Sequence, residues 1–100
     1  MLLSSDNQRS DKYIVLVIYD IIDNRRRQKL AKMLKGYGFR IQKSAFECSL
    51  SIGKFNKLVN QINEFAIEED LIRVYRLHSN MEIKTWGDVT SIEEEDFIFY

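Results

Sequence analysis

Residues 13–30 read YIVLVIYDIIDNRRRQKL, and this stretch decides the fold. Its first seven residues are apolar or aromatic and mostly β-branched or aromatic, which favours a strand, and the run is too short for a buried helix. The run ends at Asp20, and after one tight turn Asp23 or Asn24 can cap a helix. Residues 25–27 are all arginine, although the helix dipole disfavours positive charge in a first turn.

Apolar residues at helical spacing follow the arginines and predict that one face of this helix is buried. Gly36 and Gly38 come next, and we expect them to end the helix in the left-handed conformation that glycine tolerates. Residues 39–42 and 46–52 then alternate in polarity, which predicts a hairpin that turns near residues 43–44 and is closed by Gly53.

A second helix and further strands complete the pattern. Apolar positions between residues 55 and 66 mark an amphipathic helix, residues 71–77 alternate as a strand, and residues 97–100 are expected to form a short last strand. This order predicts an α+β, ferredoxin-like βαββαβ domain with two helices on one face of a four-stranded antiparallel sheet. We expect a polar N-terminal extension over residues 1–12, the domain over 13–80, and a C-terminal tail over 81–100.

The first predicted strand is apolar on both faces, as strands buried on both sides are. The helices can cover only one face, so a second copy of the chain is the economical cover for the other. We therefore expect a homodimer that forms through the sheet face. The alternative is a monomer that tolerates the exposure, because about half of any protein surface is apolar. The two faces are Tyr13, Val15, Val17 and Tyr19 against Ile14, Leu16 and Ile18.

Composition excludes several classes of protein. The chain has 100 residues and a net charge of zero, from 15 Lys plus Arg and 15 Asp plus Glu, which gives no general reason to bind nucleic acid. Residues 25–43, however, hold eight basic residues and no acid, which indicates a basic patch. The lone Cys48 excludes an internal disulfide and a multi-cysteine zinc site. The absence of a long apolar run and of a signal-peptide pattern predicts a cytoplasmic protein with no membrane partner.

Asp20 is the candidate catalytic and metal-binding residue. It follows Ile18 by two positions, so it continues the second face of the strand at the strand end. The alternative role is a carboxylate that caps the following turn. One aspartate is a poor site for Mg²⁺, which takes one or two carboxylates plus waters, but a two-fold axis near Asp20 would supply the second carboxylate. No Ser-His-Asp spacing, glycine-rich phosphate loop or Cys/His cluster supports another chemistry.

The basic residues are candidates for nucleic-acid binding. A helix N-terminus attracts phosphate, and arginine adds bidentate phosphate geometry. The alternative is a solvated face whose arginines pair with Asp20 and Asp23. We also expect His78 to lie on the surface, Cys48 to be buried, and Trp86 to pack against the protein. The candidate nucleic-acid contacts are Arg25, Arg26, Arg27, Arg40 and Lys43.

The stretch YDIIDNRRRQKLAKMLKGYGFRIQKSAFEC resembles the opening of the CRISPR-associated endoribonuclease family, the smaller of the two universal adaptation proteins. Members read as an apolar strand ending in Y-D-I, an Asp, an arginine-rich helix start, K-x-L, Y-G, and a hairpin of the form R-x-Q-x-S-x-F-E. The resemblance is strong over residues 13–52 and extends in element order to about residue 78. The matching residues are Tyr19, Asp20, Asp23, Arg26, Leu34, Gly38, Arg40, Gln42, Ser44, Phe46 and Glu47.

The resemblance implies a homodimer in which Asp20 of each subunit flanks a divalent metal such as Mg²⁺. It also implies partnership with the CRISPR integrase in spacer acquisition, and metal-dependent endonuclease activity on RNA or duplex DNA. Tyr19 and Phe46 would shape the site, and the tail over residues 81–100 would contact the other subunit or a partner. Two other functions stay open: a non-catalytic scaffold that binds nucleic acid, and a toxin-like RNase of the same fold outside CRISPR systems.

Overall fold

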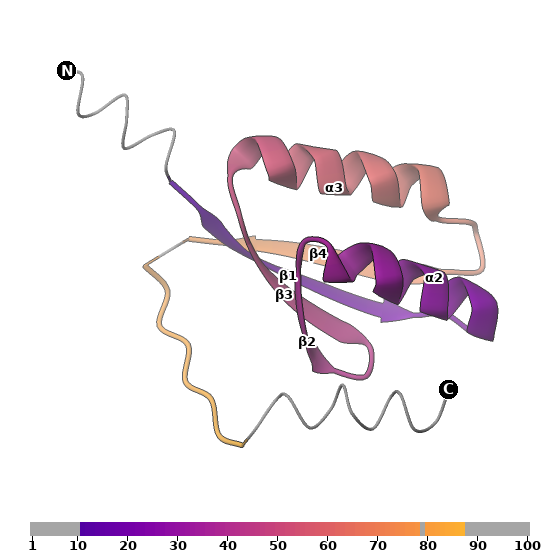
Figure 1. The fold of residues 1–100 in the computed structure, drawn as a ribbon, viewed down its shortest axis with the longest axis horizontal. Coiled ribbons are helices and arrows are strands. Elements are labelled where there is room, and N and C mark those ends of the chain that lie inside the picture. Colours follow the sequence, from indigo (N-terminus) through magenta and orange to yellow (C-terminus); the bar gives the residue numbers. More distant parts are fainter. Residues whose placement is uncertain (1–10, 79, 88–100) are drawn as a thin grey trace.

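A computed structural model describes residues 11–78 and 80–87, and its helices and strands follow the predicted order. Two helices lie side by side on one face of a single sheet (Figure 1). The elements are β1 (Tyr13–Asp20), α2 (Asn24–Lys35), β2 (Gly38–Gln42), β3 (Ala45–Leu50), α3 (Ile52–Phe65) and β4 (Leu71–Leu77).

The sheet has the strand order β2-β3-β1-β4, and every neighbouring pair is antiparallel. β1 lies at the centre of the sheet, where Val17 is opposite Phe46 of β3 and Val74 of β4. This order confirms the predicted α+β, ferredoxin-like arrangement. The predicted alternation of β1 is also confirmed, because Val15, Val17 and Tyr19 are buried whereas Ile18 and Asp20 are exposed.

The core lies between the helices and the sheet. α2 contributes Leu30 and Leu34, and α3 contributes Leu58, and all three side chains are fully buried. Cys48 of β3 joins this core, as expected, and burial raises the pKa of its thiol to about 11, so the thiol is a poor nucleophile at neutral pH. The opposite face of the sheet has no helix over it (Figure 1).

The start of α3 corrects the predicted hairpin. Ser51 caps α3 by accepting a hydrogen bond from the Lys54 amide, so Ile52 and Gly53 belong to the helix and not to a strand and its closing turn. The alternating sequence pattern runs two residues beyond the end of β3 at Leu50, because Ser51 and Ile52 continue it in residue type. Ile52 is 46% exposed and packs into no core.

The glycines after α2 do not act as predicted either. Gly36 is right-handed, with φ −75° and ψ −11°, and Gly38 has no positive φ. Gly38 is required for a different reason: a Cβ at this position would lie 2.2 Å from the Glu47 carbonyl oxygen and 2.7 Å from the Cys48 sulfur. The hairpin of β2 and β3 therefore closes only over a residue with no side chain.

Other predictions concern the chain ends. Residues 1–10 of the predicted extension and the predicted strand over residues 97–100 lie outside the described residues. His78 is exposed, as expected. Trp86 is 84% exposed, so the prediction that it packs against the described part of its own chain is wrong. Among the described residues, no helix combines the length and apolar character needed to cross a membrane.

Candidate functional site

Asp20 is the last residue of β1 and is exposed. It lies opposite Leu71, the first residue of β4, and its side chain belongs to the sheet face that the helices leave uncovered. Leu71 is 56% exposed. The carboxylate thus lies at the edge of a partly apolar, accessible face, where a second macromolecule could reach it.

Two other segments meet the sheet at the same end. The Tyr19 amide donates a hydrogen bond of 3.0 Å to the Ser44 carbonyl, so the turn between β2 and β3 lies beside the end of β1. α2 begins four residues after Asp20, capped by Asp23, whose carboxylate accepts from the Arg26 amide at 2.9 Å. The fold therefore brings the acidic strand end, the Lys43 turn and the start of the arginine-rich helix to one end of the molecule.

The two aromatic residues expected to shape this site lie on the other face. Tyr19 is 3% exposed and Phe46 is fully buried, and their rings stack with centroids 6.5 Å apart. Tyr19 precedes Asp20 directly, so strand alternation turns the two side chains in opposite directions. Tyr19 and Phe46 consequently belong to the core and do not line a site on the Asp20 face, which corrects the predicted role.

Arg26 joins α2 to the far end of α3. Its Nη2 atom donates hydrogen bonds to the Phe65 carbonyl at 2.7 Å and to Asp70 Oδ2 at 2.5 Å, and its guanidinium lies 4.2 Å from the centre of the Phe65 ring. Asp70 also accepts from the Ile67 amide at 3.1 Å. The Arg26 guanidinium holds the pKa of the Asp70 carboxyl below its ordinary value. Arg26 thus stabilises the fold, and its charge faces carbonyl and carboxylate oxygens.

Arg27 also has a structural role, whereas Arg25 has none. Arg27 donates to the Ile21 carbonyl at 2.8 Å and the Ile22 carbonyl at 3.1 Å, so it stabilises the loop between β1 and α2. Arg25 is exposed, and its side chain makes no hydrogen bond or ion pair with another described residue. Among residues 11–78 and 80–87, neither Arg26 nor Arg27 forms an ion pair with Asp20 or Asp23, which was the expected alternative.

Arg40 is 5% exposed on the helix side of the sheet. Its guanidinium lies 5.2 Å from the centre of the Phe46 ring and donates to the Lys43 carbonyl at 3.1 Å. Burial in the core corrects the prediction that Arg40 contacts nucleic acid. Lys43 is exposed in the turn between β2 and β3. Arg25 and Lys43 are therefore exposed cations at this end of the molecule, and Arg73 of β4, directly opposite Ile18, is another exposed cation on the uncovered face.

A metal site would need more ligands than one copy of this face offers. The described residues contain no group of three or more His, Cys, Asp or Glu side chains that could hold an ion. One exposed carboxylate is a poor site for Mg²⁺, which takes one or two carboxylates plus waters. A second oxygen donor would make Asp20 a suitable ligand. A single copy of the chain is therefore an incomplete metal site.

Two residues of this region carried no functional prediction. Ile22 is 87% exposed beside the Asp20 strand end, next to the buried Ile21. The sequence indicated this exposure, because only one of two adjacent isoleucines in a short loop can point into the core. Asp70 had no such signal, because 44 residues separate it from Arg26 in the sequence.

These features define a class of protein: a ferredoxin-like α+β domain with one uncovered sheet face and an exposed carboxylate at its central strand end. The sequence model of the family described as CRISPR associated protein Cas2 matches residues 13–85. The CRISPR-associated endoribonuclease Cas2 of Mycobacterium tuberculosis is 47% identical over 89 residues, which are 89% of this chain and 79% of that protein. The chain belongs to the Cas2 family.

Solved structures agree with this assignment. The Cas2 of Streptococcus pyogenes is 33% identical, with a TM-score of 0.64, over 74% of this chain and 99% of that one. A chain of a partial Cas6-RT-Cas1--Cas2 complex is 27% identical, with a TM-score of 0.57, over 68% of this chain and 81% of that one. The similarity extends over most of the domain whose central strand ends at Asp20.

Proposed function

We propose that this protein is a cytoplasmic CRISPR adaptation protein, a homodimer that binds the CRISPR integrase in spacer acquisition and cleaves phosphodiester bonds of RNA or DNA at a site built on Asp20. The observation that carries the proposal is the exposed Asp20 at the end of β1, on the uncovered sheet face of a Cas2-family chain. Relatives named endoribonuclease support the nuclease activity. Family membership favours this function over a toxin-like RNase outside CRISPR systems.

The uncovered face supports the homodimer. Ile18, Leu71 and Tyr75 are 38%, 56% and 36% exposed on this face, and Phe39 of the edge strand is 50% exposed. Ile14 and Leu16 of β1 are half-buried on the same face. The face also carries Glu47 opposite Leu16 and Arg73 opposite Ile18. An exposed, largely apolar surface marks an association site, and a self-complementary face closes into a two-fold dimer. The helices on the opposite side leave this face accessible (Figure 1).

Dimerisation would complete the metal site. Asp20 of each subunit would hold one divalent cation such as Mg²⁺, with waters as further ligands. When bound there, the cation lowers the pKa of a bound water and offsets negative charge on phosphate. Each subunit would supply one carboxylate, which its central strand would hold at the edge of the dimer interface.

Arg25 and Lys43 are the proposed nucleic-acid contacts. Both are exposed at the Asp20 end of the sheet, and a cation near a phosphate adds affinity without regard to sequence. Arg26 and Arg27 are committed to carbonyl groups and to Asp70, so we assign them to positioning the helix start and the loop that carry Arg25. The similarity to a chain of the Cas6-RT-Cas1--Cas2 complex supports the integrase as a partner.

A non-catalytic scaffold is the second candidate function. It is favoured by one observation, that the described residues of a single chain hold no group of three metal-ligating side chains. In that case the dimer would hold duplex DNA through backbone contacts and bind the integrase, and Asp20 would have no chemical role.

The Asp20→Asn variant separates the two functions. If the protein is an enzyme, highly purified wild-type protein should cleave RNA or duplex DNA in the presence of Mg²⁺ and not in the presence of EDTA. The variant should lose this cleavage while remaining dimeric. Cleavage that survives the substitution unchanged would exclude catalysis at Asp20. Spacer acquisition in cells is the second measurement, because acquisition that persists when cleavage is lost would support the scaffold.

A further inference from the structure

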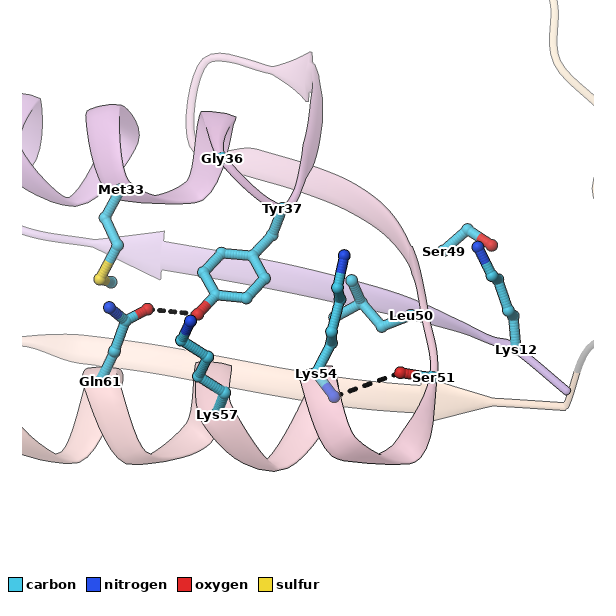
Figure 2. A pocket seen from close by; sticks show the side chains of 10 residues that line it. All are labelled: Lys12, Met33, Gly36, Tyr37, Ser49, Leu50, Ser51, Lys54, Lys57 and Gln61. Atoms are coloured by element: carbon cyan, nitrogen blue, oxygen red, sulfur yellow. Dashed lines mark hydrogen bonds between the residues drawn. The ribbon is translucent and has the colours of Figure 1, made fainter. Parts of the chain in front are cut away.

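A cavity of about 530 Å³ opens on the helix side of the molecule, away from the Asp20 face. It lies between the end of α2, the end of β3 and the first turns of α3 (Figure 2). Its volume is in the range of small-molecule sites, which span about 300–1,000 Å³. No residue of the candidate site described above lines it, so the cavity is a separate feature of the fold.

Three lysines gather around this cavity: Lys12, Lys54 and Lys57. Lys54 and Lys57 are three residues apart on α3, so both side chains rise from one face of the helix toward α2 (Figure 2). The lining contains no acidic residue. None of the three lysines forms an ion pair with a carboxylate among residues 11–78 and 80–87. The cavity therefore concentrates positive charge that the described part of the chain does not neutralise.

The position of these charges on α3 is unfavourable for the helix itself. Lys54 lies in the first turn of α3, which contains no acid, and a cation there opposes the helix dipole. Like charges at this spacing also repel each other. Ser51 already accepts the hydrogen bond of the Lys54 amide, so capping of α3 does not explain why the lysines are at these positions. A charge arrangement that weakens its own helix is explained when an anion occupies the space between the charges.

The remaining walls suit a ligand larger than a simple ion. Met33 and Leu50 give an apolar surface, and the Tyr37 ring stands above α3 with its hydroxyl bonded to Gln61 Oε1 (Figure 2). This hydrogen bond joins the α2 end to α3 across the cavity and fixes the ring. The lining is thus mostly polar and cationic with a smaller apolar part, which suits a ligand that carries both an anionic and an apolar group.

We propose that this cavity binds the phosphoryl group of a nucleotide-sized ligand, with Lys54 and Lys57 on the phosphate and Lys12 at the rim. A phosphomonoester carries a charge of about −1.5 to −2 at pH 7, and lysine binds it as a point charge. The phosphate can come from a free mononucleotide or from the 5′ end of a nucleic-acid strand. The site contains no Asp20, and most of its lining lies on the helix side of the sheet, away from the face assigned to the dimer.

The test follows backbone amide NMR shifts of the full-length protein during titration. The first arm compares AMP with adenosine, and the second compares a 5′-phosphorylated octanucleotide with its 5′-hydroxyl form. The Lys54→Gln/Lys57→Gln double variant is set against Lys29→Gln/Lys32→Gln. Lys29 and Lys32 are exposed on α2 with the same spacing and do not line the cavity, so the control removes the same charge.

We expect AMP, and not adenosine, to shift the amides of residues 49–57, and we expect the affinity to fall roughly tenfold in the Lys54/Lys57 variant but not in the control. Binding of the 5′-phosphorylated strand alone would support the proposal and identify a strand end as the source. No phosphate-dependent shift in either arm would overturn it, and so would an equal loss in the control variant. A thermal melt verifies folding, since removing two cations from the start of α3 should leave it no less stable.

Discussion

The Arg26 guanidinium lies 2.5 Å from the Asp70 carboxylate and links the first turn of α2 to the loop before β4, across 44 residues of sequence. The same nitrogen donates to the Phe65 carbonyl at the end of α3. A cation at the start of one helix thereby meets the negative end of another, which explains why the chain tolerates an arginine where the dipole of its own helix disfavours it.

The Arg26–Asp70 pair should make the stability of the folded state depend on pH. The pKa of Asp70 is lowered from its ordinary value of 3.8, mainly by the hydrogen bond from Arg26, so the folded state favours the ionised carboxylate. This contribution is complete above pH 3.8 and is lost as the pH falls through the lowered pKa of the folded state. Asp70→Asn should lower the Tm at pH 7 by a few degrees and flatten its decline in acid. Glu69→Gln, an exposed neighbour with the same charge change, should do neither; equal effects of both substitutions would refute a specific role for the pair.

The β2–β3 hairpin should reject any side chain at position 38. Gly38→Ala places a Cβ 2.2 Å from the Glu47 carbonyl oxygen, so the strands must separate. We expect a loss of about 2 kcal/mol or more in urea unfolding. Gly53→Ala is the matched control: no atom lies within 4 Å of its Cβ and it sits in a helix, so stability should rise by up to about 1 kcal/mol. Similar outcomes for both glycines would contradict the hairpin geometry.

Substitutions of the three arginines should have different effects on DNA binding and on stability. Arg25→Gln should weaken binding to duplex DNA at every sequence and flatten the salt dependence of log K by about 0.9 per lost phosphate contact, without changing the Tm. Arg26→Gln should instead lower the Tm by several degrees, because it removes the bonds to Phe65 and Asp70. The helix dipole alone predicts that replacing all three by glutamine leaves the helix no less stable, and these contacts reverse that prediction. Fluorescence anisotropy across a salt series checks the assignment, which fails if Arg25→Gln leaves both affinity and slope unchanged.

The uncovered sheet face should disappear into a dimer interface. Ile18→Glu places a charge on this face, where a partner subunit would bury it, so light scattering should report one chain for the variant and two for the wild type. Ile18 is 38% exposed, so a glutamate there remains solvated in the monomer and the fold should persist. Ile67→Glu, at 47% exposure in the loop before β4, should stay dimeric. A wild-type mass of one chain at micromolar concentration would exclude the dimer.

Local patterns of the sequence predicted the framework of this protein because period-two and helical spacing identify β1, α2, α3 and β4 directly. The two-sided apolarity of β1 indicated that one face would be left uncovered, but not which one. Asp20 falls by alternation on the face of Ile14, Leu16 and Ile18, and the structure shows that this face is the uncovered one. The predictions were wrong where one residue type suits two different backbone geometries. Ile52 continues the strand pattern but begins α3, and Gly38 resembles a helix stop but is needed for close packing.

The roles of the basic residues could not be predicted from the sequence. Nothing local distinguishes Arg25 from Arg26, because the partner of Arg26 lies 44 residues away and is brought near only by the packing of α2 on α3. Arg40 alternates onto the core side, where it lies over Phe46, although arginine is seldom buried. Tyr19 and Phe46 matched the family motif, but strand alternation turns them away from Asp20.

The central claim is that two copies of Asp20 complete one site, and the stoichiometry of metal binding tests it most directly. Mn²⁺ can stand in for Mg²⁺ in an electron paramagnetic resonance titration of the purified dimer. We expect one Mn²⁺ bound per two chains in the wild type, and loss of that ion in Asp20→Asn while light scattering still reports a dimer. One ion per chain, or undiminished binding by the variant, would contradict a site shared across the two-fold axis.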